Sequence, residues 1–312
     1  MIDWQSAVDF AARNYPNGPE ALAAHLKIVV KSTSLPGCDG YCLNYGKSAI
    51  IRINSDLTQT RRRCTLAHEL GHLILKTPSI IGETFNDMMR SDTATERDVN
   101  ALASELLLPL KVLHSHFPNP PVVSTAIRRL AKEAKVSEIA VAIRVCNATE
   151  DLQLVNSVVA FFENDDLKWQ WSKGLKMTGD TPVKLLKATR AVAPNVYRFE
   201  HEDTIGVASL LENPTLGSAT LFVQLLPKGI GNRKSKAERR LELEAILLAN
   251  DDELRNRLSG YFGAFKPQIK GMHIENAVTK FWNRYNSKLS GTTLISEEGR
   301  EYVHLRITDL LR

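Results

Sequence analysis

The chain has 312 residues, of which 43% are hydrophobic and 24% charged, and a formal net charge of +5. These values are ordinary for a globular protein with room for two domains, and the mild charge requires neither an acidic nor a nucleic-acid partner. No apolar run reaches the roughly 18 to 20 residues that cross a bilayer, and the N-terminus lacks the pattern of a secretory signal. We therefore expect a cytoplasmic protein with no membrane partner.

The first fifty residues predict helices followed by strands. Apolar residues at helical spacing indicate one or two helices over residues 3–26, broken at Pro16-Asn17-Gly18-Pro19. Strand-like runs follow at residues 26–31, 40–45 and 48–54. The last run directly precedes a helix. It is either an edge strand on which an extended polypeptide could lie or an ordinary strand of a sheet.

Residues His68-Glu69-Leu70-Gly71-His72 form an HExxH motif in the next predicted helix. Histidines four residues apart project from one helix face, at a separation that one metal ion bridges. Two neutral imidazoles suit Zn²⁺, and a catalytic zinc site takes three protein ligands and leaves a fourth position for water. Glu69 is then placed to take a proton from that water and pass it to a leaving amine. The alternative is an accidental His–Glu pair on a solvated helix.

A third ligand has to come from elsewhere in the chain. A metzincin would need Gly at position 75 and His at position 78, and this chain has Leu75 and Pro78, which excludes that class. A second helix is predicted over residues 95–108, ended by Pro109, and it carries Glu96 with Asn100 one turn on.

These stretches carry a family resemblance. The strand ending in Asn54, the run Thr65-Leu66-Ala67-His68-Glu69-Leu70-Gly71-His72 after an arginine cluster, and Glu96-x-x-x-Asn100 before Leu106-Leu107-Leu108-Pro109 resemble the ImmA/IrrE metallopeptidases. The resemblance covers about residues 20–147. It implies that His68, His72 and Glu96 bind one Zn²⁺ ion, with Mn²⁺ as a substitute, and that Glu69 is the general base. Cys64 and Val99 depart from the usual Phe and Ala, and we interpret both as packing changes.

Glu96 also has a structural interpretation. Thr93-x-x-Glu96 is a capping-box pattern, in which the glutamate would reach back to the helix N-terminus and need no metal. Thr95-x-x-Asp98 offers the same cap two residues later and would free Glu96. Substitute ligands would be Glu83, Asp92 or Asp98, and Asn100 could orient a ligand from behind. Residues 76–94 between the two helices are interpreted as a loop over the cleft.

Residues 124–144 resemble a helix-turn-helix, with Ser137 capping the second helix. If this unit binds DNA, its basic side chains would contact phosphates, namely Arg128, Arg129, Lys132, Lys135 and Arg144. The alternative is that the unit packs on the peptidase core. We favour packing because acidic residues dilute the charge and no Asn or Gln lies within residues 138–144 to read bases.

From about Asp151 the pattern changes to strands with a few helices. Strands are predicted at residues 154–163, 167–172, 196–200, 204–211 and 218–226, and helices at residues 182–191, from 233 to about 258, and over most of the last forty residues. This region loosely resembles the GAF-like part of some IrrE proteins. We expect an α+β fold with a zincin-like peptidase domain at residues 1–117, a helix-turn-helix-like segment at 118–150 packed on it, and a mixed α/β, sensory or regulatory domain at 151–312.

The sequence thus favours a zinc metallo-endopeptidase with Glu69 as its catalytic residue. The resemblance implies a narrow protein substrate, a helix-turn-helix repressor of stress-response or mobile-element genes. The alternative is a metal-stabilised regulator that binds a protein or DNA without cleaving it. A small-molecule or nucleic-acid effector could act at the C-terminal domain. Tyr45, His114 and His116 are candidates for the donor that steadies the tetrahedral intermediate, without support from their positions.

Overall fold

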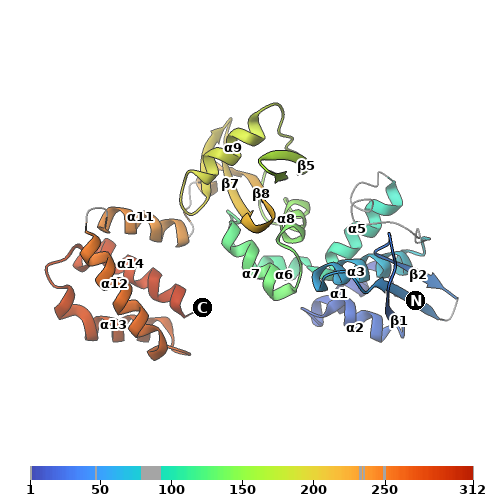
Figure 1. Cartoon of the computed structure of the whole chain (residues 1–312), viewed down its shortest axis with the longest axis horizontal. Coiled ribbons are helices and arrows are strands. Elements are labelled where there is room, and N and C mark those ends of the chain that lie inside the picture. The colour runs from blue at the N-terminus through green and yellow to red at the C-terminus, as the bar shows by residue number, and fades with distance from the viewer. Residues whose placement is uncertain are drawn as a thin grey trace. The chain divides into compact units, whose positions relative to one another are not determined.

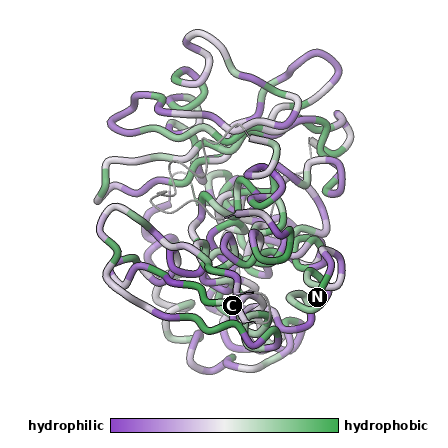
Figure 2. Tube along the Cα trace, turned by 90° about the vertical axis from the view of Figure 1, so that its right-hand side faces the viewer, coloured by the Kyte–Doolittle hydropathy of each residue, from purple (hydrophilic) through white to green (hydrophobic). Residues whose placement is uncertain are grey.

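The computed structural model describes residues 2–45, 48–78, 93–231, 234, 236–248 and 251–311. The chain divides into two compact units, residues 1–190 with 197–231, and residues 191–196 with 232–312. Figure 1 shows their helices and strands, which confirm the α+β fold class. Hydrophobic and hydrophilic stretches alternate along the trace (Figure 2), as expected for elements that each bury one face.

The first unit begins with two helices and a small sheet. The helices are α1 (Trp4–Arg13) and α2 (Gly18–His25), and the strands are β1 (Val29–Thr33), β2 (Gly40–Asn44) and β3 (Ala49–Asn54). The sheet order is β1-β3-β2, with β1 parallel and β2 antiparallel to β3. The interpretation of β3 as an edge strand is therefore wrong, because neighbouring strands occupy the hydrogen-bonding groups on both of its sides. The outer strands of this sheet are β1 and β2.

Helix α3 (Gln59–Leu75) carries the HExxH motif and packs against α5 (Ala94–Leu107). Thr58 caps the start of α3 by accepting a hydrogen bond from the backbone N–H of Arg61 at 3.4 Å. The two helices approach closely at Gly71, where an added Cβ would lie 3.1 Å from both the carbonyl oxygen and Cγ1 of Val99. This close approach brings Glu96 on α5 next to the motif on α3.

Three further helices follow, α6 (Leu110–His116), α7 (Ser124–Ala134) and α8 (Glu138–Asn147). Ser137 caps α8 as predicted, since its hydroxyl accepts a hydrogen bond from the N–H of Ala140 at 3.1 Å. Residues 141–146 of α8 are all buried. Arg144 is one of them, and its Nε donates to the carbonyl of Leu108 at 3.0 Å. The phosphate-binding interpretation of Arg144 is therefore wrong, because its guanidinium lies inside the protein.

The first unit ends with a five-stranded sheet in the order β5-β4-β8-β7-β6. Its elements are β4 (Asn156–Glu163), β5 (Asp166–Lys173), β6 (Val196–His201), β7 (Thr204–Asn213) and β8 (Ser218–Pro227), with helix α9 (Thr181–Arg190), the short α10 (Lys228–Gly231) and a 3₁₀ turn, η1 (Pro214–Leu216). One face of the sheet packs on α9 through buried residues such as Phe162, Leu210 and Leu186. A GAF-like fold is not confirmed for this region.

In the second unit, the described residues after 234 form helices joined by short turns and include no strand. Its α-helices are α11 (Lys236–Leu248), α12 (Asp252–Phe265), α13 (Ile274–Leu289) and α14 (Glu297–Leu310), with 3₁₀ turns η2 (Lys266–Gln268) and η3 (Thr293–Ile295). Figure 1 shows the helices of this unit gathered together. Their buried side chains form one hydrophobic core, which includes Phe262, Phe265 and Phe281. A single helix to about residue 258 was predicted, and the structure has two, because Asp251 caps a new start by accepting from Leu254 N at 2.8 Å.

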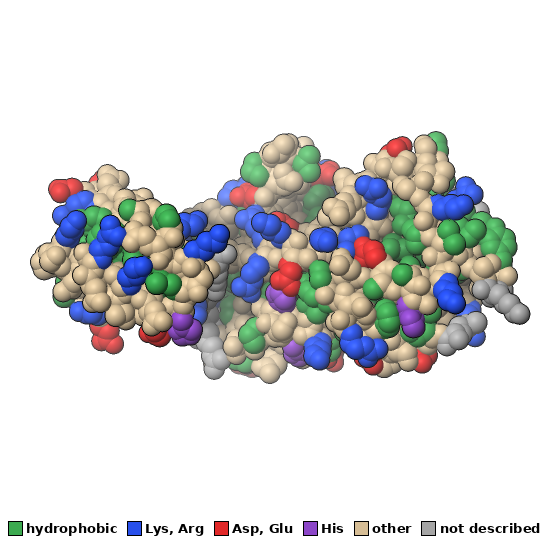
Figure 3. All heavy atoms as spheres, turned by 90° about the horizontal axis from the view of Figure 1, so that it is seen from below, with side chains coloured by type: hydrophobic (Ala, Val, Ile, Leu, Met, Phe, Trp, Pro, Cys, Tyr) green, Lys and Arg blue, Asp and Glu red, His purple; other side chains and the backbone are tan. Residues whose placement is uncertain are grey.

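Residues 151–312 were predicted as one domain, but the sheet and the C-terminal helices belong to different compact units. The boundaries predicted at residues 117 and 150 both fall inside the first unit. None of the described helices is long and apolar enough to cross a membrane. On the face drawn in Figure 3, Lys and Arg side chains are separated by other residues and form no continuous patch.

Candidate metal centre

The two histidines of the HExxH motif face each other on α3. Their Nε2 atoms lie 3.1 Å apart, and both side chains are buried. Glu96, also buried, comes in from α5 and places Oε2 at 3.5 Å from His68 Nε2 and Oε1 at 3.6 Å from His72 Nε2. The fold therefore brings together the three side chains that the resemblance implied as ligands.

This arrangement fits a tetrahedral metal ion. With metal–ligand bonds of about 2.0 to 2.2 Å, two ligand atoms of a tetrahedral zinc site lie roughly 3.3 Å apart. The distances between the Nε2 atoms of His68 and His72 and the carboxylate oxygens of Glu96 are close to that value. One ligand atom from each residue lies within 4.8 Å of the ligand atoms of the other two. Two imidazole nitrogens and one carboxylate oxygen are also a donor set that zinc accepts. The buried group can therefore hold a divalent ion.

The second nitrogen of each imidazole has its own partner. Asn100 Oδ1 lies 3.1 Å from Nδ1 of His68, and Thr77 Oγ1 lies 2.9 Å from Nδ1 of His72. An amide oxygen only accepts hydrogen bonds, so the proton of His68 belongs on Nδ1 and the lone pair of Nε2 points into the site. Asn100 thus lies behind one of the candidate ligands, and its role in orienting that ligand stays a prediction.

Thr77 was missed by the sequence analysis. It lies just beyond the end of α3, where Lys76 adopts a left-handed backbone conformation and turns the chain back. Lysine does not mark such a turn in a sequence as glycine or asparagine does. No local signal therefore points to Thr77.

Burial keeps both histidines neutral. It lowers the pKa of His68 to about 4, an effect strengthened by the neighbouring His72 and opposed by the hydrogen bond with Asn100. Burial likewise lowers the pKa of His72 to about 4. An imidazole binds metal through the nitrogen lone pair of its neutral form. The two side chains are thus in their ligand form at neutral pH.

Comparison with protein families identifies the domain that contains the motif helix and Glu96. Residues 23–145 match the peptidase family M78, described as the IrrE N-terminal-like domain. This segment is an IrrE N-terminal-like domain. It includes the motif helix, Glu96 and Asn100, and it agrees with the resemblance at about residues 20–147. The family points to a metallopeptidase or an IrrE-like regulator.

Two other comparisons concern the whole chain. No curated protein matches it. Among solved structures, a transcriptional regulator from Mycobacterium tuberculosis is similar over 71% of this chain and 74% of its own, at 12% sequence identity and a TM-score of 0.46. That likeness is too low to support an argument about function.

Within the IrrE N-terminal-like domain, the cap at the start of α5 and the position of the Glu96 carboxylate are compatible. Thr93 is the capping residue, and its hydroxyl accepts from the backbone N–H of Glu96 at 3.2 Å. This bond uses the backbone of Glu96, and the carboxylate still lies beside the two imidazoles.

The remaining candidates lie apart from the three-residue group. Asp98 is exposed and does not belong to it, whereas Glu83, Asp92 and most of the loop predicted at residues 76–94 lie outside the described residues. His116 Nε2 is 3.0 Å from Glu133, His114 is exposed, and Tyr45 is 60% exposed. None of the three joins the metal group of the IrrE N-terminal-like domain.

Glu69, the predicted general base, is only 1% exposed. It follows His68 directly, so it projects about 100° further round the helix axis. A buried carboxylate beside two metal-ligating positions has the chemistry of a proton acceptor for a reacting water. Its catalytic role remains a prediction.

Proposed function

We propose that the protein is a zinc-dependent endopeptidase that hydrolyses a peptide bond in a specific protein substrate. One observation carries the proposal. His68 and His72 on α3 and Glu96 on α5 converge at tetrahedral spacing within a domain of a peptidase family, and Glu69 lies between the two histidines in sequence.

The chemistry divides between the ion and the chain. A bound zinc ion lowers the pKa of a water molecule and polarises a carbonyl group. His68, His72 and Glu96 hold the ion, while Asn100 and Thr77 fix the orientation of the two imidazoles.

Glu69 acts on the protons. Its carboxylate accepts a proton from the attacking water and then donates that proton to the leaving amine, so that one residue serves as base and acid in turn. Its burial keeps bulk solvent away from the reacting groups. A glutamine at this position keeps the shape of the side chain and cannot carry the proton.

For the substrate we propose a helix-turn-helix repressor, as the resemblance to the ImmA/IrrE family implies. Its cleavage would switch on genes of a stress response or a mobile element. A flexible segment of such a protein could pair in extended form with an outer strand of the small sheet, where backbone hydrogen bonds hold a polypeptide regardless of its side chains. Mn²⁺ would substitute for Zn²⁺ in the same donor set.

The test uses the full-length protein and a repressor encoded beside it. We expect the zinc-loaded wild type to cleave the repressor, and Glu69→Gln to bind about one zinc ion without cleaving. The matched control is Glu253→Gln, at a side chain that is 85% exposed on α12 of the second unit, and it should cleave like the wild type. Equal cleavage by wild type and Glu69→Gln would refute the mechanism. A wild type that binds zinc and the repressor but leaves the repressor intact would instead establish a non-proteolytic regulator.

A further inference from the structure

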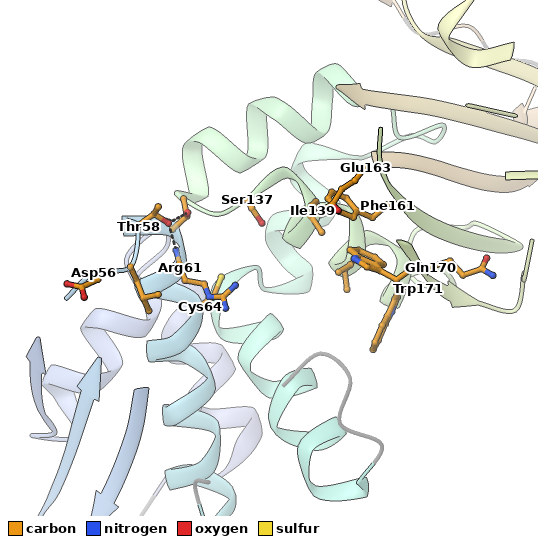
Figure 4. Close-up of a pocket in the computed structure, with 14 residues that line it drawn as sticks. Asp56, Thr58, Arg61, Cys64, Ser137, Ile139, Phe161, Glu163, Gln170 and Trp171 are labelled. Atoms are coloured by element: carbon orange, nitrogen blue, oxygen red, sulfur yellow. Dashed lines mark hydrogen bonds between the residues drawn. The ribbon is translucent and has the colours of Figure 1, made fainter. Parts of the chain in front are cut away.

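A cavity of about 740 Å³ lies within the first unit, away from the metal group. Its walls come from three separate parts of the chain, the first turns of α3, the start of α8 and the β4–β5 hairpin. In Figure 4, Thr58, Arg61 and Cys64 lie on the α3 side, and Phe161 and Trp171 lie on the hairpin side. None of the residues His68, Glu69, His72 and Glu96 lines it. The cavity is therefore a site separate from the candidate metal centre.

The hairpin contributes an aromatic wall. Phe161 on β4 and Trp169 on β5 are stacked, with ring centroids 5.4 Å apart and planes 18° from parallel. Trp171, two residues further along β5, is held in place by a hydrogen bond from its indole nitrogen to Asn147 Oδ1 at 2.8 Å. All three rings line the cavity and are only half-buried. Fixed aromatic rings that remain partly exposed offer a flat surface for another ring.

Apart from two exposed carboxylates at the cavity, Asp56 and Glu163, the other walls are mostly apolar or hold polar groups that already have partners. Ile139 and Ile143 of α8 contribute aliphatic surface. The guanidinium of Arg61 is paired with Asp39 at 2.6 Å, and the amide of Gln170 makes two hydrogen bonds to the backbone of Met177. The positive charge of Arg61, which a strongly anionic ligand would require, is thus already paired with Asp39. An uncharged, mainly apolar molecule matches this lining best.

The size of the cavity indicates the class of occupant. Pockets for small molecules measure roughly 300 to 1,000 Å³ and are lined by hydrophobic and aromatic side chains with a few polar groups. A volume of about 740 Å³ is several times that of one amino-acid side chain and falls within this range. The space therefore fits a small molecule better than a single side chain inserted by a protein partner.

We propose that this cavity binds an uncharged, planar aromatic small molecule whose ring lies against Trp169 on the β4–β5 hairpin. The ligand would contact the hairpin on one side and α3 and α8 on the other. This proposal is independent of the proposed peptidase activity, because it requires neither the metal nor Glu69.

The experiment titrates full-length protein with prodan, a neutral naphthalene dye whose emission shifts to the blue in an apolar site. We expect saturable binding that free indole displaces. Trp169→Ala should weaken binding at least about fivefold, which is the loss expected when one stacking ring is removed. Trp282→Ala is the matched control, because Trp282 packs against the core of the second unit and does not line the cavity.

A second variant guards against distortion of the hairpin. Ile139→Trp fills the cavity from the α8 side and leaves β4 and β5 unchanged, and it should also weaken prodan binding at least tenfold while the thermal unfolding midpoint stays near that of the wild type. The proposal is overturned if prodan does not saturate the wild type, or if it binds both cavity variants as tightly as the wild type. Displacement by a tryptophan-containing peptide but not by indole would also overturn it, in favour of a polypeptide occupant.

Discussion

Asn100→Ala is predicted to weaken zinc binding without removing a ligand. In the structure Asn100 Oδ1 lies 3.1 Å from Nδ1 of His68, on the side of the ring opposite the metal-facing Nε2. The alanine variant removes the acceptor that selects the Nδ1–H tautomer and holds the ring in place. His68, His72 and Glu96 all remain, so any loss of affinity reports the positioning of His68.

The expected magnitude follows from this one contact. A hydrogen bond of this kind contributes about 1 kcal/mol net, and it strengthens when the ring binds a cation because the Nδ1–H becomes more acidic. Free rotation of the imidazole adds a further loss. Together these effects correspond to the 10-fold to 100-fold change, about 1.4 to 2.7 kcal/mol, that is typical when such a supporting partner is removed. Asn100→Asp should bind zinc at least as tightly as the wild type, since a carboxylate is a stronger acceptor.

The assay is competition for Zn²⁺ against a chromophoric chelator at pH 7.5, which requires no substrate. Asp98→Ala is the matched control on the same helix, because Asp98 is exposed and outside the metal group, and its affinity should equal that of the wild type. The reasoning is wrong if Asn100→Ala binds zinc as tightly as the wild type. It is also wrong if Asn100→Asp loses as much affinity as the alanine variant.

Three further predictions concern stability and packing. The pKa values of His68 and His72 are lowered to about 4 by burial, below the value near 6.5 of the unfolded chain, so the metal-free protein should lose stability as the pH falls from 6.5 towards 4, by roughly 3 kcal/mol per histidine at most. In urea unfolding, a variant with both histidines replaced by glutamine should lose less free energy of unfolding between pH 6.5 and 4 than the wild type. An equal loss would show that protonation of the two histidines is not the cause. Gly71→Ala should lower both the thermal unfolding midpoint and the zinc affinity, because the added methyl group lies 3.1 Å from the backbone oxygen of Val99. This crowding outweighs the gain of about 1 kcal/mol in helix propensity. A raised midpoint with unchanged zinc affinity would contradict the prediction. Gln224→Leu should cost roughly 2 to 5 kcal/mol in urea unfolding, because the buried amide both donates to and accepts from the backbone of the segment before α7, and a loss below about 0.5 kcal/mol would contradict that role.

The sequence could predict the part of the site that depends on local spacing. His68 and His72 are one helical turn apart, so their common face follows from helix geometry alone. Glu96 lies on another helix, and the sequence reached it only through the family resemblance. Asn100 follows Glu96 by one turn and lies on the same face of α5. Once α5 packs with Glu96 beside the histidines, Asn100 also lies near His68.

Features that depend on pairing between distant segments could not be predicted. The central position of β3 depends on which strands flank it, and hydrophobic alternation within one strand does not specify its neighbours. The break between α11 and α12 depends on the cap made by Asp251 in a stretch that otherwise has helical character. The cavity combines residues near positions 60, 140 and 170, which no local pattern connects.

The burial of α8 has a consequence for how this protein can be divided. One side of the helix is tied to the end of α5 through Arg144, and the other meets the five-stranded sheet, where Cys146 Sγ lies 3.5 Å from the carbonyl oxygen of Ser157. A fragment cut at the family boundary, residues 23–145, would lose α1, the end of α8 and the strands β4 and β5 against which α8 packs. The boundary of a sequence family need not coincide with the boundary of a packed unit, and a fragment that exposes buried apolar side chains is prone to aggregate. Expression trials should therefore retain the chain through at least residue 231.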